Sequence, residues 1–133
     1  MKKVTVLLIT ILMMAVSLVG CGGNDDTIKT CIISNSSYSL QEELESANQE
    51  EALIVNEPVY ASVHFVESPK GMEYTVKWYL DGTEIKSETK ATEKDMQDIV
   101  VYELEAEQAV AGSLKLEVIY KDTILLTKEL IIQ

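Results

Sequence analysis

Residues 74–82, Tyr74-Thr75-Val76-Lys77-Trp78-Tyr79-Leu80-Asp81-Gly82, carry the clearest structural pattern in the chain. Apolar or aromatic side chains stand at every second position from Tyr74 to Leu80, which indicates a β-strand with one buried face. The dipeptide Asp81-Gly82 follows directly, and both residue types tolerate the positive φ angles of a two-residue hairpin turn. The stretch therefore predicts a β-hairpin.

The hairpin turn sets the register of the strand that follows. A two-residue turn pairs Leu80 with Thr83 and then Trp78 with Ile85. The residues that point outward on this return strand are all charged: Glu84, Lys86, Glu88 and Lys90. A strand with a charged outer face and a weakly apolar inner face is expected at the edge of a sheet.

The two-residue period recurs on both sides of the hairpin. Strands are predicted at five further stretches, residues 27–33, 59–66, 99–104, 114–120 and 124–132. For the last pair we expect a three-residue loop at 121–123, because it places Ile124 on the same face as Leu126, Leu130 and Ile132. About seven short strands, separated by turns, predict an all-β antiparallel sandwich.

Two segments have the spacing of a helix start. Ser39-Leu40-Gln41-Glu42 matches a capping box, in which a hydroxyl and a carboxylate satisfy free backbone amides. We therefore expect one short helix near residues 40–48. Thr92-Glu93-Lys94-Asp95 has a similar spacing and predicts a helical turn at a corner of the sandwich.

The chain from about residue 50 to 133 resembles immunoglobulin-like bacterial surface domains. The resemblance rests on residues 74–82, quoted above, and on two other alternating stretches, Val59-Tyr60-Ala61-Ser62-Val63-His64-Phe65 and Gly112-Ser113-Leu114-Lys115-Leu116-Glu117-Val118. It implies a sandwich whose third-strand tryptophan is the centre of the core, and Trp78 matches that position. The paired cysteines of antibody domains are missing, so the resemblance does not extend to that branch.

The amino-terminal segment has the order of a secretory signal: Met1-Lys2-Lys3, an apolar run over residues 4–18, and a small residue before Cys21. Leu18-Val19-Gly20-Cys21 resembles the lipobox of bacterial lipoproteins. The resemblance implies that the Cys21 thiol receives a diacylglyceryl group and that the chain is cut after Gly20. The alternative is an ordinary signal peptide with a cysteine beside its cleavage site. We thus predict a signal peptide at 1–20, a lipidated tether at 21–26 and the sandwich at 27–133.

Composition narrows the possible partners. Without Lys2 and Lys3 the chain has nine lysines, no arginine and 22 acidic residues, a net charge of −13. This charge disfavours nucleic acid as a partner, because phosphate contacts need clustered cations. The expected partners are the membrane, through the lipid on Cys21, and an envelope protein or polymer.

No arrangement of residues in the sequence points to catalysis, a metal or another cofactor. His64 is the only histidine and is predicted to be a polar surface residue, with no motif of a catalytic triad around it. Cys31 is the only thiol left once Cys21 is acylated, and a buried small hydrophobe is favoured over a nucleophile. The many carboxylates lack the spacing of a calcium loop, and solvated surface charge is the default interpretation.

One surface is a candidate for binding. Lys77, Lys86 and Lys115, with Tyr79 nearby, are predicted to share the outer face of the hairpin and of residues 114–120, with Lys77 opposite Lys86. Lysines that face one another on an acidic chain suit an anionic partner, although neighbouring glutamates neutralise them in the alternative interpretation. The expected function is a lipid-anchored, extracytoplasmic binding or structural module of the cell membrane. The alternative is an accessory subunit or small hydrolase whose carboxylates act with a partner or metal.

Overall fold

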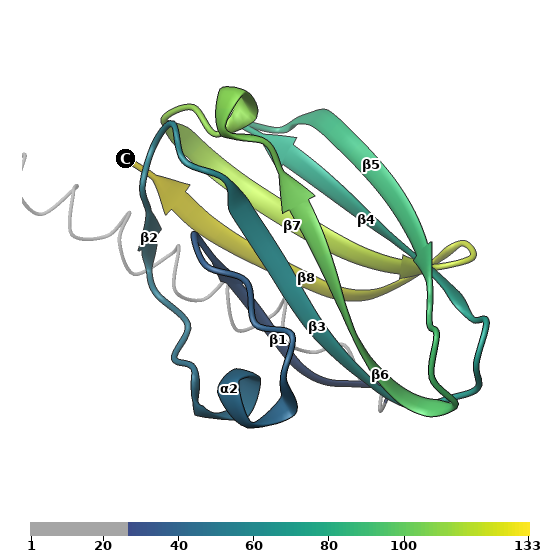
Figure 1. Cartoon of the computed structure of the whole chain (residues 1–133). Helices are drawn as coiled ribbons and strands as arrows, with labels where there is room; N and C mark the ends of the chain where they lie inside the picture. The colour runs from purple at the N-terminus through teal and green to yellow at the C-terminus, as the bar shows by residue number, and fades with distance from the viewer. Residues whose placement is uncertain (1–26) are drawn as a thin grey trace, which may run out of the picture.

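The computed structural model describes residues 27–133, so the predicted signal peptide, the lipobox-like stretch and Cys21 lie outside the described residues. Two sheets enclose one core, which confirms the predicted sandwich (Figure 1). The elements in chain order are β1 (Ile28–Ser34), α2 (Gln41–Ser46), β2 (Ala52–Leu53), β3 (Val59–Ser68), β4 (Glu73–Leu80), β5 (Thr83–Ala91), β6 (Met96–Leu104), the 3-10 helix η1 (Ala106–Gln108), β7 (Gly112–Tyr120) and β8 (Thr123–Ile132).

The two sheets differ in size. Sheet A has three strands in the order β1-β3-β6, and sheet B has five in the order β2-β8-β7-β4-β5. Neighbouring strands are antiparallel except for the short β2, which runs parallel to β8. The helix near residues 40–48 is confirmed as α2.

The core fills the space between the sheets with the residues that the alternation predicts. Trp78 has no exposed surface, and neither do Phe65 and Tyr102. The rings of Phe65 on sheet A and Tyr74 on sheet B stack with their centroids 3.9 Å apart. Such stacking adds to the burial of apolar area that holds two sheets together.

The hairpin turn has the predicted conformation. Asp81 and Gly82 have φ angles of 50° and 89°, and Leu80 pairs with Thr83. The Asp81 carboxylate also accepts a hydrogen bond from the Ser113 amide at 2.9 Å, which ties the turn to the start of β7. Both central positions therefore need the residue types found there.

The register beyond the turn differs from the prediction. An irregularity between Trp78 and Tyr79 makes Trp78 pair with Lys86, where a regular ladder would pair it with Ile85. A bulge of this kind adds one residue to one strand and moves the following side chains to the other face. Lys86 is therefore not opposite Lys77. Three residues predicted to point outward on β5 instead face sheet A: Lys86, Glu88 and Lys90.

The three-residue loop that we expected at residues 121–123 is wrong, because a shorter turn and a second bulge take its place. Tyr120 pairs with Thr123, so the turn has two residues, and the ladder shifts between Val118 and Ile119. The bulge brings Leu126, Leu130 and Ile132 to the core side as predicted. Ile124 precedes the shift, and it is 51% exposed.

The outer face of sheet A is covered, which the sequence did not indicate. The helix α2 packs against β1 and β3 and buries Leu44 completely. The segment before it also contacts β3, where the Tyr38 amide donates to Ser62 Oγ at 3.0 Å. His64 lies under this cover and is 2% exposed, so its assignment as a surface residue was wrong.

Neither predicted cap forms. The residue that caps α2 is Leu40, with no side-chain hydrogen bond to a helix amide, so Ser39 does not close a capping box. Residues 92–95 form a bend between β5 and β6 and no helical turn. Thr92 is buried there, and its hydroxyl donates to Pro69 O and accepts from the Met72 amide. Its side chain joins two loops and is not available to start a helix.

The sandwich has two distinct ends. β1 begins at the end that also carries the loop 69–72, the bend 92–95 and the turn 121–122, because Ile28 pairs with Phe65 near the end of β3. We call this the tether end. The turn 81–82, η1 and the C-terminus lie at the opposite end (Figure 1).

Candidate functional site

Three of the four residues predicted to form a binding face lie together. Across β4 and β7, Lys77 pairs with Glu117 and Tyr79 pairs with Lys115, on the outer face of sheet B. Lys86 is absent from this face because the bulge directs it toward sheet A.

Opposite charges offset the two remaining lysines. Lys77 Nζ lies 3.8 Å from Glu84 Oε1, and Lys115 Nζ lies 3.7 Å from Glu117 Oε2 and 4.6 Å from the centre of the Tyr79 ring. The Tyr79 hydroxyl donates to Glu117 Oε1 at 2.9 Å, and this hydrogen bond raises the Tyr79 pKa. The face is therefore balanced in charge rather than cationic, and binding of an anionic partner there stays a prediction.

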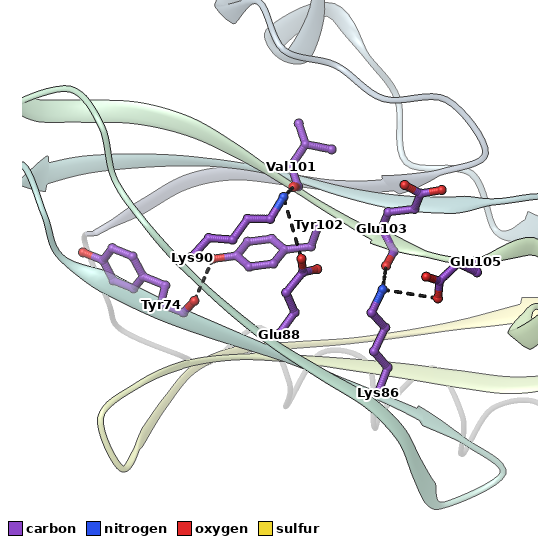
Figure 2. Close-up of polar contacts among 8 residues, drawn as sticks. All are labelled: Tyr74, Lys86, Glu88, Lys90, Val101, Tyr102, Glu103 and Glu105. Carbon is purple, nitrogen blue, oxygen red and sulfur yellow. Dashed lines mark hydrogen bonds and ion pairs between the residues drawn. The ribbon is translucent and has the colours of Figure 1, made fainter.

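The bulge creates a second polar cluster, between β5 of sheet B and β6 of sheet A (Figure 2). Lys86 Nζ donates to Glu103 O at 2.6 Å and lies 3.4 Å from Glu105 Oε1. Lys90 Nζ donates to Val101 O at 2.7 Å. We call this cluster the polar seam, and its members on β5 are Lys86, Glu88 and Lys90.

Tyr102 on β6 is the fully buried residue beneath the polar seam. Its hydroxyl donates to Tyr74 O at 2.8 Å, and Lys90 Nζ lies 5.7 Å from its ring centre (Figure 2). Burial raises the pKa of Tyr102 well above its usual value, and the Glu88 carboxylate adds to the rise. Tyr102 is therefore a neutral hydrogen-bond donor at physiological pH.

Glu88 is the incompletely satisfied member of the polar seam. Its Oε2 lies 3.9 Å from Lys90 Nζ. Its Oε1 is buried and has no hydrogen-bond partner among residues 27–133. A buried oxygen without a hydrogen-bond partner carries an uncompensated desolvation cost, which a further donor would offset.

The polar seam closes one edge of the sandwich. β6 is the outer strand of sheet A, so part of its main chain has no strand partner, and Lys86 and Lys90 supply donors to two of its carbonyls. Lysines on an edge strand are a common protection against uncontrolled strand pairing.

The opposite edge of sheet A is closed in the same way. Lys128 on β8 donates from Nζ to Cys31 O on β1. The Gln49 amide both accepts from and donates to the main chain of Ile33, at 2.9 and 2.8 Å. Gln49 therefore takes the place of a neighbouring strand.

Cys31 is inert in this environment. Burial raises the pKa of its thiol from 9.0 to about 11, partly offset by the nearby charge of Lys128. The thiolate, which is the reactive form, is thus scarce at neutral pH. This agrees with the interpretation of Cys31 as a small buried hydrophobe.

The same shift predicts a pH dependence of stability. The unfolded chain loses the Cys31 proton near pH 9 and the folded chain keeps it to about pH 11, so the unfolding free energy falls as pH rises through this window. The Cys31 contribution to this fall should reach roughly 2–3 kcal/mol by pH 11. Urea unfolding of Cys31→Ala should show a flatter pH profile above pH 9, whatever constant offset the lost volume causes. Equal slopes in both proteins would contradict the assignment.

A small hollow lies at the tether end. It has a volume of about 380 Å³ and is lined by Gly71, Met72, Glu73, Thr75, Thr89, Tyr120 and Lys121. The hydroxyls of Thr75 and Thr89 are already bonded to one another at 2.7 Å, and the Tyr120 hydroxyl donates to Met72 Sδ. Their polar groups are thus engaged with each other, and the hollow is open to solvent.

His64 and the acidic side chains are the candidates for catalysis or metal binding within residues 27–133. His64 Nε2 lies 3.2 Å from Gln97 Oε1, while its Nδ1 has no hydrogen-bond partner within residues 27–133. In this range no three His, Cys, Asp or Glu side chains are arranged to hold a metal ion. None of the helices described here has the length and apolar character needed to span a bilayer.

Comparisons with known proteins support the fold. No protein-family model matches the sequence, and neither does any curated protein. An immunoglobulin-like protein from Pseudomonas aeruginosa is similar in structure, with a TM-score of 0.50, 12% identity, and coverage of 84% of this chain and 100% of that one. A Niemann-Pick type C2 protein from the Japanese carpenter ant is also similar, with a TM-score of 0.50, 16% identity, and coverage of 85% and 96%. At these identities the similarity establishes an immunoglobulin-like β-sandwich and not a shared function.

Proposed function

We propose that the chain is a lipid-anchored module on the extracytoplasmic face of the cell membrane, where it binds or supports an envelope protein or polymer without catalysing a reaction. The observation that carries the proposal is Leu18-Val19-Gly20-Cys21, placed after a charged and then apolar segment and directly before a polar tether. Two acyl chains on Cys21, at roughly 0.8 kcal/mol per buried methylene, are enough to hold a protein on a bilayer.

The tether keeps the domain close to the membrane. β1 starts at Ile28, so six residues, 22–27, separate it from Cys21. Fully extended, they span at most about 20 Å. A module on so short a connection acts on partners near the headgroups, and its net charge of −13 disfavours close contact with anionic lipid.

The arrangement of side chains suits binding better than chemistry. Within residues 27–133 the one histidine is under the cover of sheet A and the one thiol is buried with a raised pKa. The polar groups of the seam and of the outer face of sheet B are paired in ways that support the fold. The fold leaves the outer face of sheet B and the outer edge of β5 as the surfaces for a partner.

Substitution of Cys21 tests the anchor. In detergent phase separation of cells fed labelled palmitate, the wild-type chain should enter the detergent phase with label. Cys21→Ser should take up none, because the thioether cannot form, and it should remain as precursor or be released. Cys31→Ala is the matched control and should be labelled like the wild type. A wild-type protein that stays on the membrane without label would contradict the proposal.

A further inference from the structure

The outer edge of β5 differs from the other long strand edges of the sandwich. The edges of β6 and β1 receive side-chain donors from Lys86, Lys90 and Lys128. The main chain of β5 receives one such donor from the described residues. The Gln108 side-chain amide donates to Ile85 O at 2.9 Å. Residues 86–91 of β5 lie beyond that contact and are not bonded along their outer edge by a described side chain.

The charges along β5 are self-complementary in one antiparallel register. If two β5 strands pair about Ser87, Lys86 of each copy faces Glu88 of the other. Pairing about Lys86 brings Glu84 against Glu88, and pairing about Glu88 brings Lys86 against Lys90. Opposite charges facing across strands stabilise a pair and like charges destabilise it.

The polar seam contains hydrogen-bonding groups that are not used within one copy and that this register would pair. A lysine ammonium has three donors. Lys86 uses two of them, toward Glu103 O and Glu105 Oε1. Glu88 Oε1 is buried without a described hydrogen-bond partner. The Glu88 side chain as a whole is 32% exposed, so its carboxylate and the third N–H of Lys86 are complementary across a two-fold axis at Ser87.

We propose that β5 of one copy pairs antiparallel with β5 of a second copy about Ser87 and joins their five-stranded sheets. Lysines on an edge ordinarily oppose such pairing, but here each one would face a carboxylate. The few residues involved bury less area than the roughly 1,200 Å² of a stable interface. The pairing should therefore be weak for dilute chains and strengthened where copies are concentrated on one membrane.

Cysteine cross-linking tests the pairing and its register. Ser87→Cys in the full-length chain, oxidised in isolated membranes, should give a disulfide-linked dimer, because position 87 faces itself at the distance of a cross-strand pair. Thr89→Cys is the matched control on the same exposed strand. In this register the two copies of position 89 are offset by four residues, roughly 13 Å, so it should not cross-link. The wild-type chain controls for Cys21 and Cys31. No Ser87→Cys dimer, or one from Thr89→Cys instead, would overturn the proposal.

Charge exchange tests the proposed contact independently. In the Ser87→Cys background, Lys86→Glu alone and Glu88→Lys alone each place like charges opposite one another and should lower dimer yield roughly fivefold or more. When the two variants carry different epitope tags and are expressed together, their heterodimer restores every opposite pair and should recover. Trp78 emission confirms that each is folded. A heterodimer yield no higher than the yields of the two separate variants would overturn the proposal.

Discussion

Trp78→Ala should lower the free energy of unfolding by roughly 3–5 kcal/mol, a large part of the stability of a domain of this size. Trp78 has no exposed surface and lies on β4, which pairs with both β5 and β7. Its removal leaves a cavity that neighbouring strands cannot fill without distorting the sheet. Urea unfolding followed by circular dichroism measures the loss.

Two further variants distinguish the cost of a core cavity from the cost of removing any aromatic ring or the indole N–H. Tyr79→Ala removes a ring from the opposite face of the same strand and should cost less than about 1 kcal/mol. Trp78→Phe also removes the indole N–H, which is buried without a hydrogen-bond partner within residues 27–133, and should cost less than the truncation. A loss in Trp78→Ala no larger than that of Tyr79→Ala would contradict the central place of Trp78 in the core.

Leu44→Ala should cost roughly 2–5 kcal/mol, because Leu44 is fully buried where α2 meets sheet A. Loss of the Leu44 side chain should also loosen the segment that covers Ser62 and His64. Hydrogen exchange should therefore quicken at the Tyr38 amide, which donates to Ser62 Oγ.

Leu40→Ala is the matched control for the cover. Leu40 is the N-cap residue of α2 and is 60% exposed, so its truncation should change stability by less than about 0.5 kcal/mol. Equal losses for Leu40→Ala and Leu44→Ala would mean that α2 does not pack on sheet A as described.

The sequence predicted the sandwich because its strands alternate clearly and its turns contain the required residues. The inward faces of β4, β6 and β7 follow the alternation, and Asp81-Gly82 forms the turn expected of it. The β4–β5 and β7–β8 hairpins each contain one bulge. Periodicity cannot locate a bulge, because a bulge shifts the alternation by a single residue. The bulge beside Trp78 is the reason that Lys86 was placed on the wrong face.

The remaining differences come from contacts between distant segments. His64 alternates with the core residues Val63 and Phe65 and so resembles a surface residue, yet α2 and the segment before it pack on that face of β3. The polar seam was missed because its partners are main-chain carbonyls of β6, which carry no sequence signal. The alternating charges of β5 were visible in the sequence. Glu84 points outward as predicted, and only the residues beyond the bulge were placed on the wrong face.

The mass of the mature amino-terminal peptide tests the central claim most directly. Mass spectrometry of the protein purified from membranes should find a chain that begins at Cys21 and carries a diacylglyceryl group on its sulfur. Alkaline hydrolysis of the ester-linked chains should lower the mass by that of the acyl groups. A mature chain with an unmodified Cys21, or one that begins at another residue, would contradict the lipid anchor and the envelope function built on it.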